Sequence, residues 1–181
     1  MRRIQQRIKR IKMLLLDVDG VMTDRTVILG PDNVEMQRFN MHDGVGVAMA
    51  RAAGLRVGIL TGRNSEAVRK RARELRVDEL KQGYFVKEKG YHLILKKHGL
   101  KDEEIAYVGD DIIDLPVLKR VGLAITVADG IDDVKKICHY VTQRRGGEGA
   151  VREVVELLLS GMGKKEDAVN ALLKYGKGGR P

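Results

Sequence analysis

The sequence predicts an α/β fold, a doubly wound parallel sheet with helices on both faces. Short apolar runs alternate with longer segments of helical periodicity along most of the chain. The apolar runs are rich in Leu, Val and Ile without strict polar alternation, which is typical of strands that are covered on both faces. Parallel strands joined through helices need right-handed crossovers, so such a series builds one layered domain.

Five apolar runs are expected to form the strands, in the order 13–18, 56–60, 105–108, 123–127 and 139–141. The helices are expected between them, over residues 45–53, 66–76, 87–98, 115–121, 131–137 and 150–159. Glycine follows three of these helices, at positions 54, 99 and 122, where helices often end. Asp43 is placed to cap the helix that starts beside it.

Residues 25–40 interrupt this alternation. They read RTVILGPDNVEMQRFN, two short strands around the turn Gly30-Pro31-Asp32-Asn33. We therefore expect a β-hairpin inserted after the first strand. We expect one domain over residues 1–160 and a basic C-terminal tail over residues 161–181, in which GKKEDAVNALLKYGKGGRP could form a short amphipathic helix with a loose end.

The composition excludes several classes of protein. The net charge of +9 belongs to the ends, because residues 1–12 hold six bases and no acid, and residues 161–181 hold five bases and two acids. Aromatic residues make up 4% of the chain, too few for a platform that stacks nucleic-acid bases. One cysteine excludes an intramolecular disulfide. The apolar run 13–16 is too short to span a membrane, so we expect a cytoplasmic protein with no membrane partner.

The stretch KMLLLDVDGVMTD places Asp17 and Asp19 at the exit of the first strand, where their charges repel. In a doubly wound sheet, ligands bind beyond the carboxyl ends of the strands. Other polar residues are expected at the same edge: Thr61, Lys87, Asp110, Asp111 and Asp114.

Several carboxylates gathered at one edge cannot all ionise unless a cation neutralises them. An all-oxygen cluster without histidine or thiol favours a hard cation, and Mg²⁺ fits best because it pairs carboxylates with phosphate. A lysine and a threonine hydroxyl beside the ion would attract a phosphoryl group. The sequence therefore predicts a magnesium and phosphate site.

The motifs DVDGVMTD, ILTGR, Lys87 and GDDIID resemble, in order and spacing, the four motifs of the haloacid dehalogenase superfamily of phosphatases. The resemblance implies that Asp17 is the nucleophile, which forms an aspartyl-phosphate. It implies that Asp19 is the general acid and base, and that its backbone carbonyl binds Mg²⁺. The metal residues that it implies are Asp17, Asp19, Asp110, Asp111 and Asp114.

The same resemblance implies that Thr61 binds the phosphoryl oxygens and that Lys87 holds the nucleophile. Lys89 competes for the lysine role, and the spacing from Gln82-Gly83 favours Lys87.

The gaps between the motifs leave no room for a cap domain, so the chain resembles the capless branch of the superfamily. The stretches FNMHDGVGVAMARAAGLRVGILTGR and YVTQRRGGEGAVREVVELLL are similar to the 3-deoxy-D-manno-octulosonate 8-phosphate (KDO 8-phosphate) phosphatases. This implies an acidic sugar phosphate as substrate. It also implies a homotetramer, in which hairpins assemble and a neighbouring subunit serves as the cap. The substrate-binding residues expected are Gly62, Arg63, Arg71 and Gly147.

Three alternatives remain beside this interpretation. The substrate could be a nonulosonate 9-phosphate or another small phosphometabolite. A signalling receiver domain also forms an aspartyl-phosphate, but its aspartate closes a middle strand whereas Asp17 closes the first. The basic ends could bind RNA, as a role added to the phosphatase chemistry rather than replacing it.

Overall fold

A computed structural model of the protein describes residues 2–175. Within them, six strands form one sheet in the order β5-β4-β1-β6-β7-β8, and every neighbouring pair is parallel. The strands are β1 (Met13–Leu16), β4 (Arg56–Leu60), β5 (Glu79–Lys81), β6 (Ile105–Val108), β7 (Leu123–Thr126) and β8 (Tyr140–Val141). The predicted doubly wound parallel sheet is confirmed.

Strand β5 was missed by the sequence prediction. It is three residues long, it begins with Glu79 and ends with Lys81, and it pairs only with β4 along the edge of the sheet. So short a polar segment has no periodicity that separates it from a loop. Its pairing with β4 is what makes it a strand.

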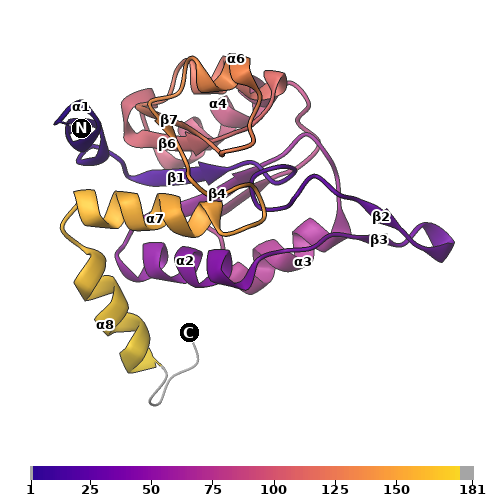
Figure 1. The fold of residues 1–181 in the computed structure, drawn as a ribbon, viewed down its shortest axis with the longest axis horizontal. Helices are drawn as coiled ribbons and strands as arrows, with labels where there is room; N and C mark the ends of the chain where they lie inside the picture. Colours follow the sequence, from indigo (N-terminus) through magenta and orange to yellow (C-terminus); the bar gives the residue numbers. More distant parts are fainter. Residues whose placement is uncertain (1, 176–181) are drawn as a thin grey trace.

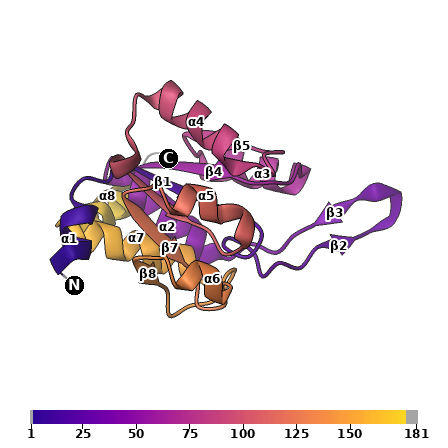
Figure 2. The same ribbon diagram turned by 90° about the horizontal axis from the view of Figure 1, so that it is seen from above.

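Helices cover both faces of the sheet (Figures 1 and 2). Side chains alternate along β1, so that Leu14 and Leu16 join one apolar core while Met13 and Leu15 join the other. Helices α4 (Lys87–His98), α5 (Leu115–Leu118) and α6 (Asp132–Lys135) pack on the face of Leu15. The opposite face is covered by α1 (Arg2–Ile8), α2 (Met41–Ala52), α3 (Glu66–Leu75), α7 (Ala150–Gly161) and α8 (Lys165–Tyr175).

Helix α8 lies in the segment 161–181, which we expected to be a basic tail. It packs against α2 and α7, and Ala168 is fully buried there. Residues 176–181 lie outside the described part of the chain. The division of the chain at residue 160 stays a prediction.

The predicted hairpin is present, and it projects from the body of the molecule (Figures 1 and 2). Its strands β2 (Ile28–Leu29) and β3 (Glu35–Met36) are antiparallel and are joined through the 3₁₀ turn Pro31–Asn33. Apolar side chains on it face solvent: Ile28, Leu29, Val34 and Met36. Between β4 and β6 the chain forms only α3, β5, α4 and the 3₁₀ turn Asp102–Glu104, so this part contains no cap domain. No helix within residues 2–175 is long and apolar enough to cross a membrane.

The topology places the site. The chain leaves β1 and winds outward through β4 to β5, then crosses back to β6 on the other side of β1. The winding direction therefore reverses between β1 and β6. In sheets of this kind, the crevice for a ligand opens beyond the carboxyl ends of the two strands at the reversal.

Candidate active site

The loop after β1 is a tight turn that exposes its acidic residues toward this crevice. The backbone N–H of Asp17 donates to the Val108 carbonyl, 3.0 Å away, which continues the pairing with β6. The N–H groups of Met22 and Thr23 then both donate to the Val18 carbonyl, at 2.9 and 3.1 Å. Gly20 makes this turn with a φ of 89°, a left-handed conformation that favours glycine.

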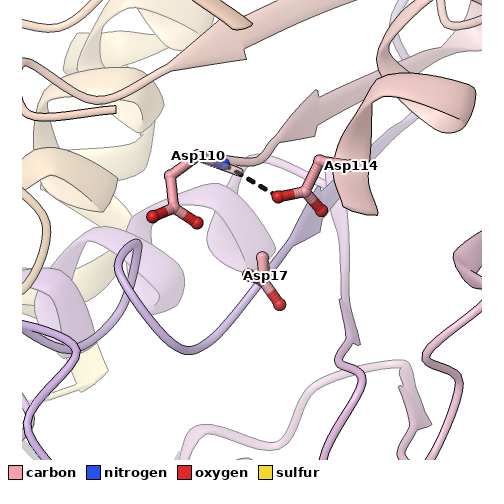
Figure 3. A group of neighbouring side chains, drawn as sticks. All are labelled: Asp17, Asp110 and Asp114. Carbon is pink, nitrogen blue, oxygen red and sulfur yellow. Dashed lines mark hydrogen bonds between the residues drawn. The ribbon is translucent and has the colours of Figure 1, made fainter. Parts of the chain in front are cut away.

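Three buried aspartates meet beyond β1 and β6, and we refer to Asp17, Asp110 and Asp114 as the aspartate cluster (Figure 3). One carboxylate oxygen from each lies within 4.8 Å of the others. Asp17 comes from the end of β1, whereas Asp110 and Asp114 come from the loop and 3₁₀ turn after β6. Residues almost a hundred positions apart are thus brought into one site.

Lys87, the first residue of α4, is buried beside the cluster. Its Nζ lies 2.8 Å from Asp17 Oδ1 and 2.5 Å from Asp114 Oδ1. Burial favours a neutral amine, but the two carboxylates outweigh this effect and raise the pKa of Lys87. The lysine therefore stays charged and holds the Asp17 side chain in place.

Asp114 is occupied by donors from several sides. Its Oδ1 accepts from Lys87 and from the Tyr107 hydroxyl, and its Oδ2 accepts from the N–H groups of Asp110 and Asp111, at 2.9 and 3.1 Å. Four donors fill a carboxylate's lone pairs. Asp114 thus orients the loop and the lysine, and leaves the open coordination positions to Asp17 and Asp110.

The described residues do not supply enough positive charge to keep both Asp17 and Asp110 ionised. Burial raises the pKa of Asp17 to about 8, against the opposing attraction of Lys87. Burial also raises the pKa of Asp110 to about 6, and its Oδ1 is buried without a hydrogen-bond partner in the described part of the chain. An all-oxygen cluster with an unsatisfied buried acceptor fits a hard divalent cation.

Asp19 faces the hairpin. Its Oδ1 accepts from the Gln37 side chain at 2.8 Å, and partial burial raises its pKa although the charge of Arg63 opposes this. Arg63 in turn pairs with Glu35 on β3, at 2.6 Å. The hairpin therefore supplies contacts to two of the predicted site residues, which its distance from them in sequence did not suggest.

Thr61 and Gly62 follow β4 at the same edge of the sheet. Thr61 is buried, and its hydroxyl accepts from the N–H of Arg63 at 3.3 Å. Gly62 lies beside the backbone of Phe85, just before α4. Both therefore stand next to the start of the helix that carries Lys87.

Gly147 lies against the loop that follows β1. Its N–H donates to the Val21 carbonyl at 3.0 Å, and its φ is 71°. A Cβ at this position would lie 2.6 Å from the Asp24 nitrogen, closer than any side chain can approach. A glycine is needed here because two loops of the site pass in direct contact.

Three residues lie elsewhere than expected. The Asp111 side chain is exposed and accepts from the Ile112 N–H at 2.6 Å, outside the aspartate cluster. Arg71 is buried against the start of α2, where it donates to the Asn40 carbonyl at 3.2 Å. The prediction that Asp43 caps α2 is wrong: Asn40 caps α2, and Asp43 accepts from the Arg152 N–H of α7.

Three contacts of the site were missed from the sequence: those of Tyr107, Gln37 and Arg25. Tyr107 lies in β6 and donates to Asp114, and Gln37 lies in the hairpin. Arg25 pairs with Asp110 at 2.8 Å. Successive side chains of β6 point to opposite faces of the sheet, which puts Tyr107 on the face covered by α4 and could have revealed its contact, but the hairpin residues carry no signal of their own.

Comparison with known proteins agrees with this geometry. A family model described as haloacid dehalogenase-like hydrolase matches residues 79–154. The 3-deoxy-D-manno-octulosonate 8-phosphate phosphatase KdsC of Yersinia pestis is 40% identical over 90% of this chain and 87% of that protein.

Two solved structures extend the comparison. One is 3-deoxy-D-manno-octulosonate 8-phosphate phosphatase from Moraxella catarrhalis in complex with magnesium ion, phosphate ion and KDO. It superposes with a TM-score of 0.91 at 34% identity, over 95% of this chain and 99% of that one. The other is the cobalt-bound deoxy-D-mannose-octulosonate 8-phosphate phosphatase from Haemophilus influenzae, with a TM-score of 0.87 at 33% identity, over 93% and 99%.

The doubly wound sheet and the aspartate cluster define a haloacid dehalogenase-like hydrolase, with no cap domain among residues 2–175. Within that superfamily, the chain belongs to the 3-deoxy-D-manno-octulosonate 8-phosphate phosphatase family.

Proposed function

We propose that this protein is a Mg²⁺-dependent phosphomonoesterase that hydrolyses KDO 8-phosphate to KDO and phosphate. The observation that carries the proposal is the placement of Asp17. Its carboxylate is buried at the end of β1, 2.8 Å from Lys87 and within 4.8 Å of Asp110. The family membership supports the substrate. A nonulosonate 9-phosphate or another small phosphometabolite is the alternative.

The reaction would run in two displacements at phosphorus. A carboxylate oxygen of Asp17 attacks the phosphorus, the bond to the sugar oxygen breaks, and Asp19 gives its proton to the leaving oxygen. Water then attacks the aspartyl-phosphate, Asp19 takes a proton from that water, and phosphate leaves. The raised pKa of Asp19 suits a group that must hold a proton before the first step.

Lys87 and Thr61 would stabilise the transferring group. Lys87 keeps Asp17 in position and offsets the negative charge that develops on the phosphoryl oxygens. The Thr61 hydroxyl lies at the end of β4, where it would donate to one of these oxygens. Both side chains are buried, so water screens their interactions with the phosphoryl oxygens only weakly.

The carboxylates of Asp17 and Asp110, with the backbone carbonyl of Asp19, would hold Mg²⁺. Asp114 would orient the loop, and Asp111 would act on water around the ion. When bound, the ion supplies positive charge that neutralises the substrate phosphate. The buried Asp110 Oδ1 has no hydrogen-bond partner among the described residues, and this supports the assignment.

Arg63, Gly62 and Gly147 would contact the sugar acid. Arg63 is exposed at the rim, where it could exchange its partner Glu35 for a substrate carboxylate. Arg71 is buried against α2, so we propose that it acts on the substrate only through the position of that helix.

We propose that the protein is a cytoplasmic homotetramer. The hairpin exposes Leu29 and Met36, and an apolar surface of this kind is stabilised by contact with another copy. The change Leu29→Glu should lower the mass measured by sedimentation without loss of secondary structure. An unchanged mass, or a monomeric wild-type protein, would count against the tetramer.

A substrate profile with and without Mg²⁺, run beside the variant Asp17→Asn, tests the function. Wild-type protein should release phosphate from KDO 8-phosphate faster than from other sugar phosphates, and EDTA should stop the reaction. Asp17→Asn should abolish turnover while the circular dichroism spectrum stays that of the wild type. The exposed Asp133 offers a matched control, since Asp133→Asn should leave turnover unchanged. Persistent turnover in Asp17→Asn would rule out the proposed nucleophile.

A further inference from the structure

Arg25 contacts the aspartate cluster, and the proposed reaction does not use it. This residue follows Asp24 at the base of the hairpin. Its Nε and Nη2 both lie 2.8 Å from Asp110 Oδ2. The cation therefore sits on a carboxylate that would bind the metal.

The guanidinium of Arg25 is also held from its other side. Its Nη1 lies 2.7 Å from Asp129 Oδ2, and its Nη2 donates to the Asp129 carbonyl at 3.0 Å. Asp129 is itself fixed by the N–H of Gly146, 3.0 Å from its Oδ1. Arg25 would therefore remain close to Asp110 even if their direct contact were broken.

The backbone around Arg25 is shaped to allow this pairing. Its φ is 68°, a left-handed conformation that few residues with a side chain adopt without cost. A Cβ at Gly20 would lie 2.1 Å from Asp110 Oδ2 and 2.7 Å from Arg25 Nε. The turn after β1 thus has a glycine where the ion pair fills the space.

We propose that Arg25 is an internal counter-cation, which stabilises the metal-free enzyme and weakens its affinity for a divalent ion. The inference rests on the proposed function in one respect, that Asp110 is a metal ligand. Without metal, Arg25 neutralises Asp110 amid like charges. When an ion binds Asp110, the guanidinium and the ion are close and repel one another. The repulsion weakens ion binding whether the ion binds the free Oδ1 or displaces Arg25 from Oδ2.

The consequence for the enzyme is a metal site that releases its ion more readily. Asp110 always has a cation beside it, so emptying the site does not leave its charge unpaired in a buried place. The fraction of sites that hold an ion would then vary with the Mg²⁺ concentration over a range in which a more negative site would stay saturated.

The test measures metal affinity rather than turnover. Mn²⁺ binding is followed by the electron paramagnetic resonance of the free ion, in wild-type protein and in Arg25→Asn, because asparagine tolerates a positive φ. The variant should bind Mn²⁺ more tightly by on the order of tenfold, and should melt at a lower temperature in EDTA. The charge-retaining Arg25→Lys should stay within roughly threefold of the wild type.

The neighbouring Arg38 provides a control of equal charge. It pairs with Asp24 and makes no contact with the aspartate cluster, so Arg38→Asn should leave Mn²⁺ affinity unchanged. Equal or weaker binding by Arg25→Asn would overturn the inference and leave the proposed function standing. Asp110→Asn is expected to bind no Mn²⁺. If the wild-type protein also bound none, the proposed function itself would be overturned.

A second measurement serves if Arg25→Asn does not fold. The Nε–Hε signal of Arg25, assigned through Arg25→Lys, is observed by nuclear magnetic resonance while Mg²⁺ is added to wild-type protein. We expect that signal to shift with saturation while the corresponding signal of Arg38 stays in place. An Arg25 signal that Mg²⁺ leaves unchanged would overturn the inference.

Discussion

The molecule has two clusters in which buried acids contact bases, and their charges balance differently. In the aspartate cluster, Lys87 and Arg25 face three carboxyls, and the pKa values of Asp17 and Asp110 are raised. At the start of β5, Glu79 is also buried, yet its pKa is lowered. Burial alone would raise it.

The partners of Glu79 explain the contrast. Lys97 and His98 lie 2.7 and 3.0 Å from its carboxylate, and Lys81 lies 3.5 Å away. One acid is surrounded by several bases, so the ionised form is stabilised where it stands. In the aspartate cluster the carboxyls outnumber the bases, and a metal ion can neutralise this excess of negative charge. In these two clusters, the direction of the pKa shift follows the local balance between acids and bases.

The largest expected effect comes from removing the lysine between two of the aspartates. Lys87→Met should lower the free energy of unfolding by about 3–5 kcal/mol in EDTA, because Asp17 and Asp114 then lack their buried counter-charge. Urea denaturation measures it. A loss of less than about 1 kcal/mol would mean that the carboxyls simply protonate and that the ion pair contributes little.

The second largest effect is expected from adding Mg²⁺, which should stabilise the protein through the aspartate cluster but not through Glu79. At a Mg²⁺ concentration of 100 times its dissociation constant, the unfolding free energy should rise by about 2.7 kcal/mol through binding to the native state. Asp110→Asn should lose this increase, whereas Glu79→Gln should keep it, since Glu79 already has its cations. Equal responses in the two variants would show that the ion acts elsewhere.

The two clusters should also respond to pH with opposite sign in metal-free protein. Asp17 and Asp110 have raised pKa values, about 8 and about 6, so their contribution is present near pH 4 and is lost as the pH rises toward 8. One pKa unit corresponds to about 1.4 kcal/mol, so shifts of this size should give a loss of several kcal/mol even though the carboxyls share protons. Glu79 contributes above its ordinary pKa and loses that contribution in acid.

Denaturation at several pH values, with and without Mg²⁺, measures these opposite slopes. Saturating Mg²⁺ should flatten the decline between pH 4 and pH 8, because the ion replaces the protons on the cluster. Asp110→Asn should flatten part of it in the absence of metal. A metal-free protein whose stability rises steadily from pH 4 to pH 8 would contradict the contrast.

The smallest effect is expected from the matched lysine of the second cluster. Lys97→Met should lower the unfolding free energy by less than about 1 kcal/mol, since Lys97 is largely exposed and Glu79 keeps His98 and Lys81. Phosphate release should not change. A loss of unfolding free energy comparable to that of Lys87→Met would show that the two clusters depend equally on their lysines.

Much of the fold could be predicted from local patterns. Strands β4 and β6 begin and end at the predicted residues, as does helix α4, because the two strands are continuous apolar runs and a glycine marks the end of α4. The motifs after β1, β4 and β6 indicated which side chains lie at the carboxyl edge. Strand β5 and helix α1 were missed, since neither has a periodic pattern long enough to distinguish it.

The arrangement within the site was less predictable. Asp111 and Asp114 belong to one motif, yet only Asp114 turns inward, because it receives Lys87 and Tyr107 from other elements. Arg71 stands among similar residues on α3, and its contact with α2 depends on how the two helices pack. Nothing near Arg25 in the sequence points to Asp110, which lies 85 positions away.

The sequence by itself determined the chemistry at the sheet's edge, since strand ends and the acidic residues that follow them are set by neighbours a few positions apart. The tertiary structure decided which charges are matched and which are left in surplus. Burial and partners come from segments far apart in the chain, and the free energy of a buried charge depends on distances of a few ångströms.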